Sequence, residues 1–356
     1  MTTGDHIAHS PPGHPAQTHP ERGGDRREAR VALLAELDAC LTHGSGELAA
    51  LHRHAVLPAG KLLRPLLVVD AALATGGPVH PVLPAAVAME LLHVGSLIHD
   101  DIIDGDIERR GRDSVHHRFG THRAILGGDA LFFRPFALVT QCRERGVPDE
   151  RVVRAGRALA EAGEELCRGA MLELDQAGVP ELSLEAYLRM AGLKTSPLFS
   201  GACRIGAILS GADRGEVAAL DRYGHALGIA FQARDDLLPY DTEPPASGKP
   251  ADSDLGNRRP TLPVILAHQR AAPDDRTLIE KLLADGARGA DAQARMAEVV
   301  RRTGAPEAAR EVLDEHVRRC HRALTVFDPG PGVAEMAAMA NRLRRQASRP
   351  AGSVLR

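Results

Sequence analysis

Apolar residues recur at helical spacing through most of the chain, and this pattern is the strongest limit on its fold. Near the N-terminus Val31, Leu34, Leu37 and Leu41 follow one another every three or four residues, as on one face of an α-helix, and residues 43–46 end the segment. Similar segments are predicted at roughly 60–75, 82–104, 121–143, 149–173, 183–211, 213–240, 260–270, 274–286, 290–303, 305–325 and 332–347. Alternating β-branched runs, the usual sign of strands, are not apparent. The chain is therefore predicted to be all-α.

The helical segments lie between two terminal stretches of different character. Residues 1–28 are rich in His, Pro and Gly and almost free of apolar side chains, so we expect a disordered tail, with partner binding as one role for it. Residues 29–349 should form one all-α domain, and residues 350–356 a flexible C-terminus. A Pro- and Gly-rich stretch at 242–259 is long for a loop and is typical of a lid or binding loop.

Composition excludes several classes of function. The net charge of −3 suggests no nucleic-acid partner. The longest uncharged stretch, Ala71–Met89, is interrupted by glycines and prolines, so no transmembrane segment is expected, and the N-terminus carries no apolar signal segment. The five cysteines are scattered and lack CxxC spacing, which is typical of reduced thiols rather than of a metal site. We therefore expect a cytoplasmic protein.

Two acidic clusters, DDIID at 100–104 and RDDLLPYD at 234–241, stand inside apolar helical segments. On a helix Asp100 and Asp104 stack one turn apart, and Asp101 lies beside them. Carboxylates buried in such a group repel one another and need cations, and oxygen ligands with open positions suit Mg²⁺. A solvated acidic face is the plainer alternative, but the apolar flanks of both clusters disfavour it. The clusters therefore predict a magnesium site.

Basic and polar residues accompany the acids. Arg109 and Arg110 follow soon after the first cluster, and arginines beside magnesium are suited to holding a diphosphate. Further groups, each weak alone, are Lys61 and Arg64 on one face at the start of a helix, His93 two turns before Asp100, Lys194 and Thr195 in mid-helix, Gln232 three residues before Asp235, and Lys249 in the long loop.

Together these residues resemble a known family. The matching stretches, in family order from residue 60 to residue 263, are GKLLRP, ELLHVGSLIHDDIIDGDIERRG, GGD at 127–129, KTSPLF, FQARDDLL and GKPADSDLGNRRPTLP. They resemble the trans-isoprenyl diphosphate synthases of the polyprenyl synthetase family. The resemblance implies an isoprenoid-synthase-type barrel of antiparallel helices around a deep apolar pocket, and usually a homodimer. It also implies a chain-elongating prenyltransferase that condenses isopentenyl diphosphate with an allylic diphosphate.

The resemblance assigns roles to individual residues. It implies three Mg²⁺ ions, two of them bridged by Asp100 and Asp104 with Asp101 in support, and the third held by Asp235. It implies that the allylic diphosphate is held by Arg109, Lys194 and Lys249, and the diphosphate of isopentenyl diphosphate by Lys61, Arg64, His93 and Arg110. Thr195 and Gln232 would stabilise the developing allylic cation. The departing pyrophosphate would take the final proton, so no side-chain nucleophile is needed.

Three positions depart from the family pattern. Pro239 stands where the second acidic motif usually ends in Asp, and Asp241 would lie on the far side of an uninterrupted helix. Ala170 replaces a family Gln, and Arg259 replaces a late lysine with its charge kept. These changes bear on the third metal site. Because the first Asp of the second motif carries the metal in the family, we expect activity to survive them.

Two other functions remain open at the level of sequence. A terpene cyclase of related fold also uses a DDxxD motif, but it has no second diphosphate to occupy the four-residue basic set. Aromatic residues make up only 3% of the chain, without Trp, which leaves few faces to steer a carbocation. A non-catalytic subunit of a heteromeric synthase usually loses the first acidic motif, which is intact here.

Product length is expected to depend on residues upstream of Asp100, along the path of the growing chain. Ser96 and Gly95 are small, so the aromatic floor that often stops family members at fifteen carbons is missing there. Leu92 and Met89 lie further down and are large enough to close the pocket. We therefore predict a main product near twenty carbons (geranylgeranyl diphosphate), with twenty-five or more as the alternative.

Overall fold

Helices make up nearly all regular structure in the computed structural model, which describes residues 26–42, 45–240 and 253–347. The α-helices are α1 (Arg26–Thr42), α2 (Gly46–Val56), α3 (Leu63–Ala74), α4 (Leu83–Asp104), α5 (Val115–Phe119), α6 (Thr121–Gln141), α7 (Asp149–Asp175), α8 (Leu184–Lys194), α9 (Ser196–Ser210), α10 (Arg214–Leu237), α11 (Ser253–Gly256), α12 (Leu262–Arg270), α13 (Pro273–Ala284), α14 (Ala290–Arg302), α15 (Ala305–Leu324) and α16 (Pro331–Ala347). The 3-10 helices are η1 (His80–Val82), η2 (Arg143–Arg145) and η3 (Leu238–Tyr240). The prediction of an all-α fold is confirmed.

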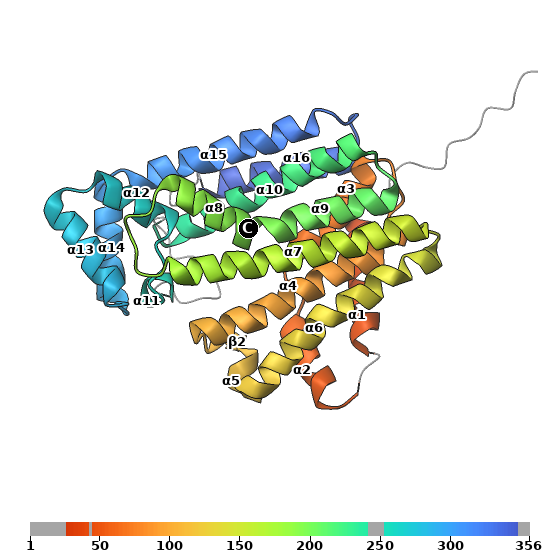
Figure 1. Ribbon diagram of the computed structural model, residues 1–356, viewed down its shortest axis with the longest axis horizontal. Helices are drawn as coiled ribbons and strands as arrows, with labels where there is room; N and C mark the ends of the chain where they lie inside the picture. Colours follow the sequence, from red (N-terminus) through yellow and green to blue (C-terminus); the bar gives the residue numbers. More distant parts are fainter. Residues whose placement is uncertain (1–25, 43–44, 241–252, 348–356) are drawn as a thin grey trace, which may run out of the picture.

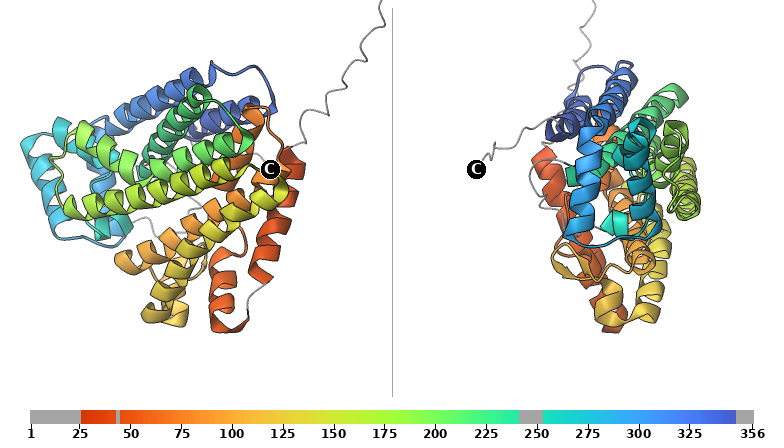
Figure 2. Two further views of the ribbon diagram at one scale, coloured as in Figure 1. Left: turned by 45° about the vertical axis from the view of Figure 1, so that its right-hand side comes forward. Right: turned by 90° about the vertical axis from the view of Figure 1, so that its left-hand side faces the viewer.

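The long helices pack side by side around a shared core (Figure 1). α9 contacts α3, α7 and α10, while α4 packs against α6 and α3, and α15 covers α10. Helices α11 to α14 gather at one end of the molecule, on the left in Figure 1. The right-hand view in Figure 2 looks onto this end, down the long axis of the bundle. This arrangement agrees with the predicted barrel of helices.

Helix α4 runs through the middle of the core and carries the first acidic cluster at its C-terminal end. Its apolar residues are almost completely buried, as Leu91 and Met89 illustrate. Among the described residues, the segment His80–Asp104 is the one helix that is long and apolar enough to cross a membrane by length and composition alone, and most of it is buried inside the fold. Because burial in the core explains its apolar character, its length alone does not argue for a membrane span.

Two glycines allow helices to approach closely where the functional residues lie. A Cβ atom at Gly169 of α7 would overlap the backbone nitrogen of Lys194 at the end of α8. A Cβ atom at Gly228 of α10 would lie 2.5 Å from Ser196 Cα at the start of α9. Only glycine permits backbones this close, so these positions bring α7 and α10 directly against the α8–α9 junction.

The structure corrects several predicted boundaries. The segment predicted as one helix at 183–211 is two helices that meet at Thr195, because Pro197 in the first turn of α9 cannot donate the N–H that a continuous helix needs. Lys194 and Thr195 are therefore at a junction and not in mid-helix. The prediction missed α2, α5 and the antiparallel pair β1 (Glu108–Arg109) and β2 (Arg112–Asp113).

The N-terminal boundary also differs from the prediction. Helix α1 begins at Arg26, whose guanidinium lies 3.0 Å from the buried carboxylate of Asp70 and also pairs with Glu335. Residues 26–28 thus belong to the folded domain, although they were assigned to the tail. Residues 1–25, most of the predicted long loop and the predicted C-terminal stretch lie outside the described residues.

Candidate active site

A cavity of about 660 Å³ opens beside the C-terminal end of α4, a volume in the range of about 300–1,000 Å³ that ligand pockets usually have. Most of the predicted site residues line it, although they come from four separate stretches of the chain. They are Lys61, Arg64, His93, Asp100, Asp104, Arg109, Arg110, Lys194, Thr195, Gln232 and Asp235. The structure therefore brings the acidic and the basic predicted groups into one cavity.

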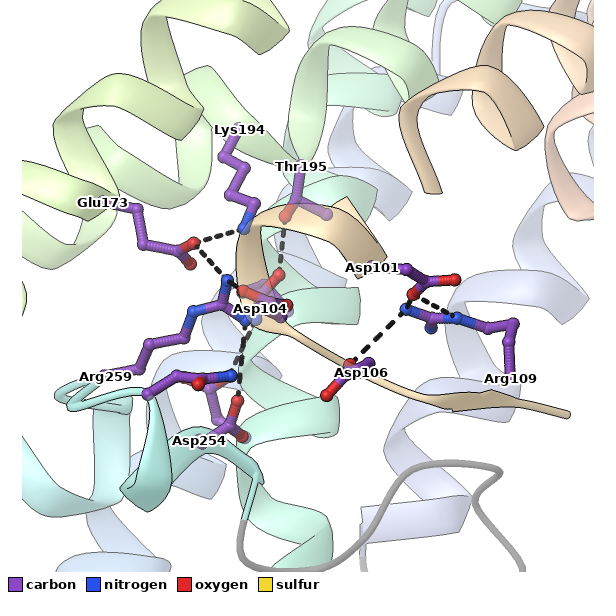
Figure 3. Close-up of polar contacts among 12 residues, drawn as sticks. Asp101, Asp104, Asp106, Arg109, Glu173, Lys194, Thr195, Asp254 and Arg259 are labelled. Atoms are coloured by element: carbon purple, nitrogen blue, oxygen red, sulfur yellow. Dashed lines mark hydrogen bonds and ion pairs between the residues drawn. The ribbon is translucent and has the colours of Figure 1, made fainter. Parts of the chain in front are cut away.

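The first acidic cluster divides into two environments. Asp100 and Asp104 line the cavity, whereas Asp101 is buried and points away from it, toward Arg109 (Figure 3). Arg109 Nε donates to Asp101 Oδ1 at 2.8 Å, and its guanidinium lies 3.8 Å from Asp106. Asp101 therefore orients Arg109 at the cavity edge, and its support of the metal ligands stays a prediction.

A network of ion pairs crosses the mouth of the cavity from three helices. Arg259, which precedes α12, pairs with Asp104 at the end of α4 and lies 3.1 Å from Glu173 of α7. Lys194 of α8 pairs with the same Glu173 carboxylate. Burial lowers the pKa of Arg259, but Glu173 and Asp104 raise it by more, so it stays charged. Arg259, which replaces the family lysine, therefore lies beside Asp104 and Glu173, as Figure 3 shows.

The predicted isopentenyl diphosphate set has a buried part and an exposed part. Arg64 is enclosed: its guanidinium lies 4.5 Å from the ring centre of Phe199 and donates to His93 Nε2 at 3.1 Å. Burial lowers the pKa of Arg64 to about 10, so it remains a cation at neutral pH. Burial and the nearby Arg64 and Arg110 hold the pKa of His93 well below its ordinary value, so its ring is neutral and accepts the Arg64 hydrogen.

Lys61 was predicted to lie on the first turn of a helix with Arg64, and this is wrong. Leu62 adopts a left-handed conformation at φ 54°, and α3 begins only at Leu63. Lys61 therefore belongs to the preceding loop, from which its exposed side chain reaches the same cavity. The left-handed residue, which sequence spacing cannot reveal, sets its direction.

The second acidic motif lies at the end of α10, which is shorter than the predicted segment at 213–240. α10 stops at Leu237, and Pro239 lies in η3 on the cavity wall. Burial raises the pKa of Asp235, an effect that the neighbouring Arg234 opposes with an ion pair at 3.0 Å. Asp241 lies outside the described residues, and so does Lys249, which was predicted to hold the allylic diphosphate.

Thr195, Gln232 and Asp236 form one hydrogen-bonded chain in the cavity wall. The Thr195 hydroxyl donates to Gln232 Oε1 at 2.6 Å, and Gln232 Nε2 donates to Asp236 Oδ1 at 2.8 Å. The other Asp236 oxygen accepts the backbone N–H of Leu262 at 2.9 Å. Burial raises the pKa of Asp236 to about 7. Both predicted cation-stabilising residues are thus held by a carboxylate that sequence reasoning had not singled out.

The residues predicted to set product length do not all face the cavity. Ser96 lines it, but a Cβ atom at Gly95 would lie 3.0 Å from the Phe132 ring of α6, so the expectation that Gly95 lines the path is wrong. Leu92 and Met89 are buried and do not line the cavity. Their role in closing the path of the product stays a prediction.

Several cavity residues carry charge or polarity that the sequence motifs did not indicate. Glu173 was noted only as part of a family stretch, and its pairing with two cations gives it a structural role at the mouth. Arg342, on α16, lies far beyond the last motif, which ends at residue 263, so no spacing could have pointed to it. Further charged or polar lining residues outside the predicted set include Gln176, Tyr187, Arg234, Asp236 and Asp254.

The carboxylates suit magnesium held jointly with a ligand. Among the described residues no basic side chain forms an ion pair with Asp100, which leaves its oxygens for a cation. Within the same part of the chain, the one group of His, Cys, Asp or Glu ligand atoms all within 4.8 Å of one another is Glu181, His268 and Glu280, none of which lines the cavity. The cavity acids are therefore too spread for an all-protein cage, and Mg²⁺ usually binds through one or two carboxylates together with phosphate oxygens.

Comparison with known proteins agrees with the motifs. The family model described as polyprenyl synthetase matches residues 46–301, more than half of the chain. The chain is 39% identical over 266 residues to a geranylgeranyl diphosphate synthase of Mycobacterium tuberculosis, which covers 74% of this chain and 75% of that protein. It is 35% identical over 288 residues to a short chain isoprenyl diphosphate synthase of Methanothermobacter thermautotrophicus, which covers 81% and 87% of the two chains.

A solved structure shares the fold over nearly the whole length. It is a polyprenyl synthase of Caulobacter crescentus, crystallised with calcium and isoprenyl diphosphate. The superposition has a TM-score of 0.81 at 29% identity and covers 93% of this chain and all of that one.

Proposed function

The chain belongs to the polyprenyl synthetase family of trans-prenyltransferases, and from that premise we propose that it elongates an allylic diphosphate with isopentenyl diphosphate in a Mg²⁺-dependent reaction. One observation carries the proposal. A single cavity contains the acids Asp100, Asp104 and Asp235 and also a separate group of cations, Lys61, Arg64 and Arg110, which form no ion pair with these acids in the part of the chain that the structure describes. Two diphosphates can therefore be held in one space, each by its own chemistry.

The proposed mechanism assigns a task to each group. Asp100, Asp104 and Asp235 would hold magnesium, which when bound supplies positive charge that stabilises the leaving pyrophosphate. Lys194, Arg109 and Arg259 hold the allylic diphosphate beside it.

The second substrate is held by Lys61, Arg64, His93 and Arg110 with its double bond near the allylic carbon. The allylic C–O bond breaks and its electron pair leaves with pyrophosphate. The isopentenyl double bond then forms the new C–C bond to the allylic carbon, and a proton passes from the resulting cation to pyrophosphate. Thr195 and Gln232 line the cavity where positive charge develops and present oxygen atoms to it.

The two alternative functions fit the cavity less well. A terpene cyclase has no second diphosphate that could bind to the buried Arg64–His93 pair. Burying a cation without a ligand is costly, so this pair disfavours a cyclase. A non-catalytic subunit would not need the acids Asp100 and Asp104, both of which face the cavity.

For product length we propose about twenty carbons. The support is the small Ser96 on the cavity wall, and the proposed floor is formed by Leu92 and Met89, which are buried one and two turns before it on α4. Replacing Ser96 with Phe should narrow the cavity and shorten the product by one or two isoprene units. The double variant Leu92→Ala with Met89→Ala should lengthen the product. A wild type that stops at fifteen carbons, or a product pattern that Ser96→Phe leaves unchanged, would place the floor elsewhere. Gly95→Phe is a poor test, because it would collide with Phe132.

We also propose a homodimer formed through α6. Leu126 and Phe133 lie two turns apart on this helix and are 66% and 73% exposed, with Phe136 nearby at 43%. An apolar face of this kind suits a second copy, since a two-fold interface pairs the same patch with itself. Sedimentation velocity should show a dimer that Phe133→Asp dissociates, and a monomeric wild type would refute the proposal. Cytoplasmic location stays a prediction, in keeping with five cysteines that are all free.

The activity itself is tested by supplying isopentenyl diphosphate with each short allylic diphosphate and sizing the product after hydrolysis. We expect elongation that EDTA stops and Mg²⁺ restores. Cyclic hydrocarbon products, or full elongation in metal-free buffer, would overturn the proposal.

A further inference from the structure

Asp236 lies next to the proposed metal ligand Asp235, yet its contacts show a different task. It is 4% exposed, and its two oxygens accept from Gln232 Nε2 at 2.8 Å and from the Leu262 backbone N–H at 2.9 Å. Both oxygens are thus directed into the protein, toward α10 and the start of α12. Asp236 lines the cavity, but both of its oxygens are already occupied by these two donors.

The chemistry of a carboxylate decides how Gln232 is oriented. An amide side chain has a donor end and an acceptor end of nearly equal shape, so its orientation depends on its partners. Both Asp236 oxygens accept hydrogen bonds, Oδ1 from Gln232 Nε2 and Oδ2 from the Leu262 N–H, so the NH₂ end of Gln232 faces Asp236. The carbonyl end, Oε1, then faces Thr195 and can only accept.

This orientation in turn determines the polarity of Thr195. Its hydroxyl hydrogen is used in the 2.6 Å bond to Gln232 Oε1, so the lone pairs of Oγ1 remain for the cavity that both residues line. A lone pair presents negative charge to a cation that forms there. With the amide reversed, Gln232 would donate to Thr195, and the hydroxyl hydrogen would be released toward the cavity with the wrong sign for a cation.

We infer that Asp236 is a positioning residue, which fixes the Gln232 amide and through it directs the Thr195 oxygen toward the reacting centre. The inference rests on the proposed prenyl transfer for its catalytic meaning. It extends that proposal by giving the second acidic motif two separate tasks, with Asp235 available to metal and Asp236 setting the polarity of the cavity wall. It also offers a reason why Pro239 can replace the last acid of the motif without disturbing this network.

Asp236→Asn tests the inference with almost no change of shape. One end of the new amide can still accept the Leu262 N–H, so its NH₂ end faces the NH₂ end of Gln232 and favours reversal of that amide. We expect kcat to fall by about 10- to 100-fold, which is the effect of losing one hydrogen bond to a developing charge. KM for both diphosphates and the Mg²⁺ requirement should stay near those of the wild type, because no diphosphate-binding cation is altered.

A second substitution separates polarity from mere structure. In Gln232→Glu two carboxylates face each other, and kcat should fall. In the double variant Asp236→Asn with Gln232→Glu, the carboxylate introduced at position 232 accepts from the amide NH₂ introduced at position 236 and from the Thr195 hydroxyl, and the total charge equals that of the wild type. The double variant should therefore recover most of the loss seen in Asp236→Asn. Asp70→Asn, which removes another buried carboxylate outside the cavity, is the matched control and should keep its kcat at about pH 8, above the raised pKa of that carboxyl.

The outcomes that would overturn the inference are definite. They are a wild-type kcat in Asp236→Asn, or a double variant whose loss equals the product of the two single losses. If Asp236→Asn does not fold, the double variant, in which donors and acceptors match again, should fold and turn over, and an inactive double variant would refute the account.

A measurement without turnover distinguishes this inference from the proposed function. In protein labelled with ¹⁵N-glutamine, the Gln232 side-chain signal is identified by its loss in Gln232→Glu. It should shift in Asp236→Asn and stay in place in Asp70→Asn. A shift in a protein that does not elongate prenyl diphosphates would refute the function alone, and an unmoved signal would refute the positioning role.

Discussion

At the scale of single residues, the same kind of charge behaves differently according to its burial. Arg64 and Lys61 are both proposed to bind isopentenyl diphosphate, but Arg64 is enclosed by Phe199 and His93 while Lys61 is exposed on a loop. A buried guanidinium contributes to packing and to the hydrogen-bond network as well as to ligand binding. The two cations should therefore fail in different ways when they are replaced.

Lys61→Ala should raise KM for isopentenyl diphosphate and leave the melting temperature unchanged, since each charge-assisted contact is worth about 1.5–3 kcal/mol. Arg64→Ala should raise the same KM and also lower the melting temperature, because it leaves a hole beside Phe199. Steady-state kinetics with each substrate varied in turn, together with thermal unfolding, provides the check. Equal effects of Lys61→Ala on both substrates would show that the diphosphate sites are misassigned.

Asp70 should make stability depend on pH. Asp70 is completely buried on α3, and this burial raises its pKa to about 7. The nearby Arg26 and Arg342 lower the pKa by less than burial raises it, and Glu335 raises it further. Its protonated form is therefore favoured in the folded protein, so its contribution to stability is present below about pH 4 and is lost as the pH rises toward 7.

Relative to the wild type, Asp70→Asn should gain stability over that pH range by about 1.4 kcal/mol for each pH unit. Urea unfolding of both proteins at several pH values measures the difference. A constant difference across the range would mean that the Arg26 pair outweighs the cost of burial.

At the scale of helices, the functional residues depend on close backbone contacts. Glu173 and Lys194 meet because Gly169 lets α7 touch the end of α8. Gly156 lies on the same helix, and nothing is within 4 Å of the position where its Cβ would be. The two glycines thus form a matched pair, one at a contact and one free of it.

Gly169→Ala should lower both the melting temperature and kcat, because the added methyl group forces α7 away from the α8–α9 junction. Gly156→Ala should leave kcat unchanged and stabilise the protein by up to about 1 kcal/mol through helix propensity. Thermal unfolding and steady-state kinetics compare them. Full activity in Gly169→Ala would show that the junction tolerates movement.

The first helix gives a prediction about truncation. A protein that begins after residue 25 keeps Arg26 and its pairs with Asp70 and Glu335, so its melting temperature should match that of the full chain. A protein that begins after residue 28 leaves Asp70 buried without Arg26 and should lose about 1–3 kcal/mol. Equal melting temperatures for the two truncations would show that the Arg26 contacts contribute nothing.

Helix patterns explain why some elements were predictable and others were not. The segments at 82–104 and 149–173 have strong periodicity, and their predicted ends lie close to those of α4 and α7. The junction at Thr195 was missed because apolar spacing continues across it, although Pro197 was visible in the sequence. Gly95 and Ser96 are neighbours on one helix, and only the packing of Phe132 shows which of them faces the cavity.

At the scale of the whole molecule, the sequence motifs located the site because each motif carries charge that the fold must place together. What spacing could not provide is how those charges pair. Arg259 meets Asp104 and Glu173 from the loop before α12, and Arg342 reaches the cavity from α16. These are contacts between distant parts of the chain, which the order of residues along the chain does not encode.

The central claim is that one cavity binds two diphosphates, only one of them through metal. Isothermal titration calorimetry with isopentenyl diphosphate and with a non-reactive allylic thiolodiphosphate tests it directly. Isopentenyl diphosphate should bind with or without Mg²⁺ and should be weakened by Lys61→Ala, while the allylic analogue should require Mg²⁺ and be weakened by Asp104→Asn. Binding of a single diphosphate that excludes the other, or an equal need of both for Mg²⁺, would contradict the account.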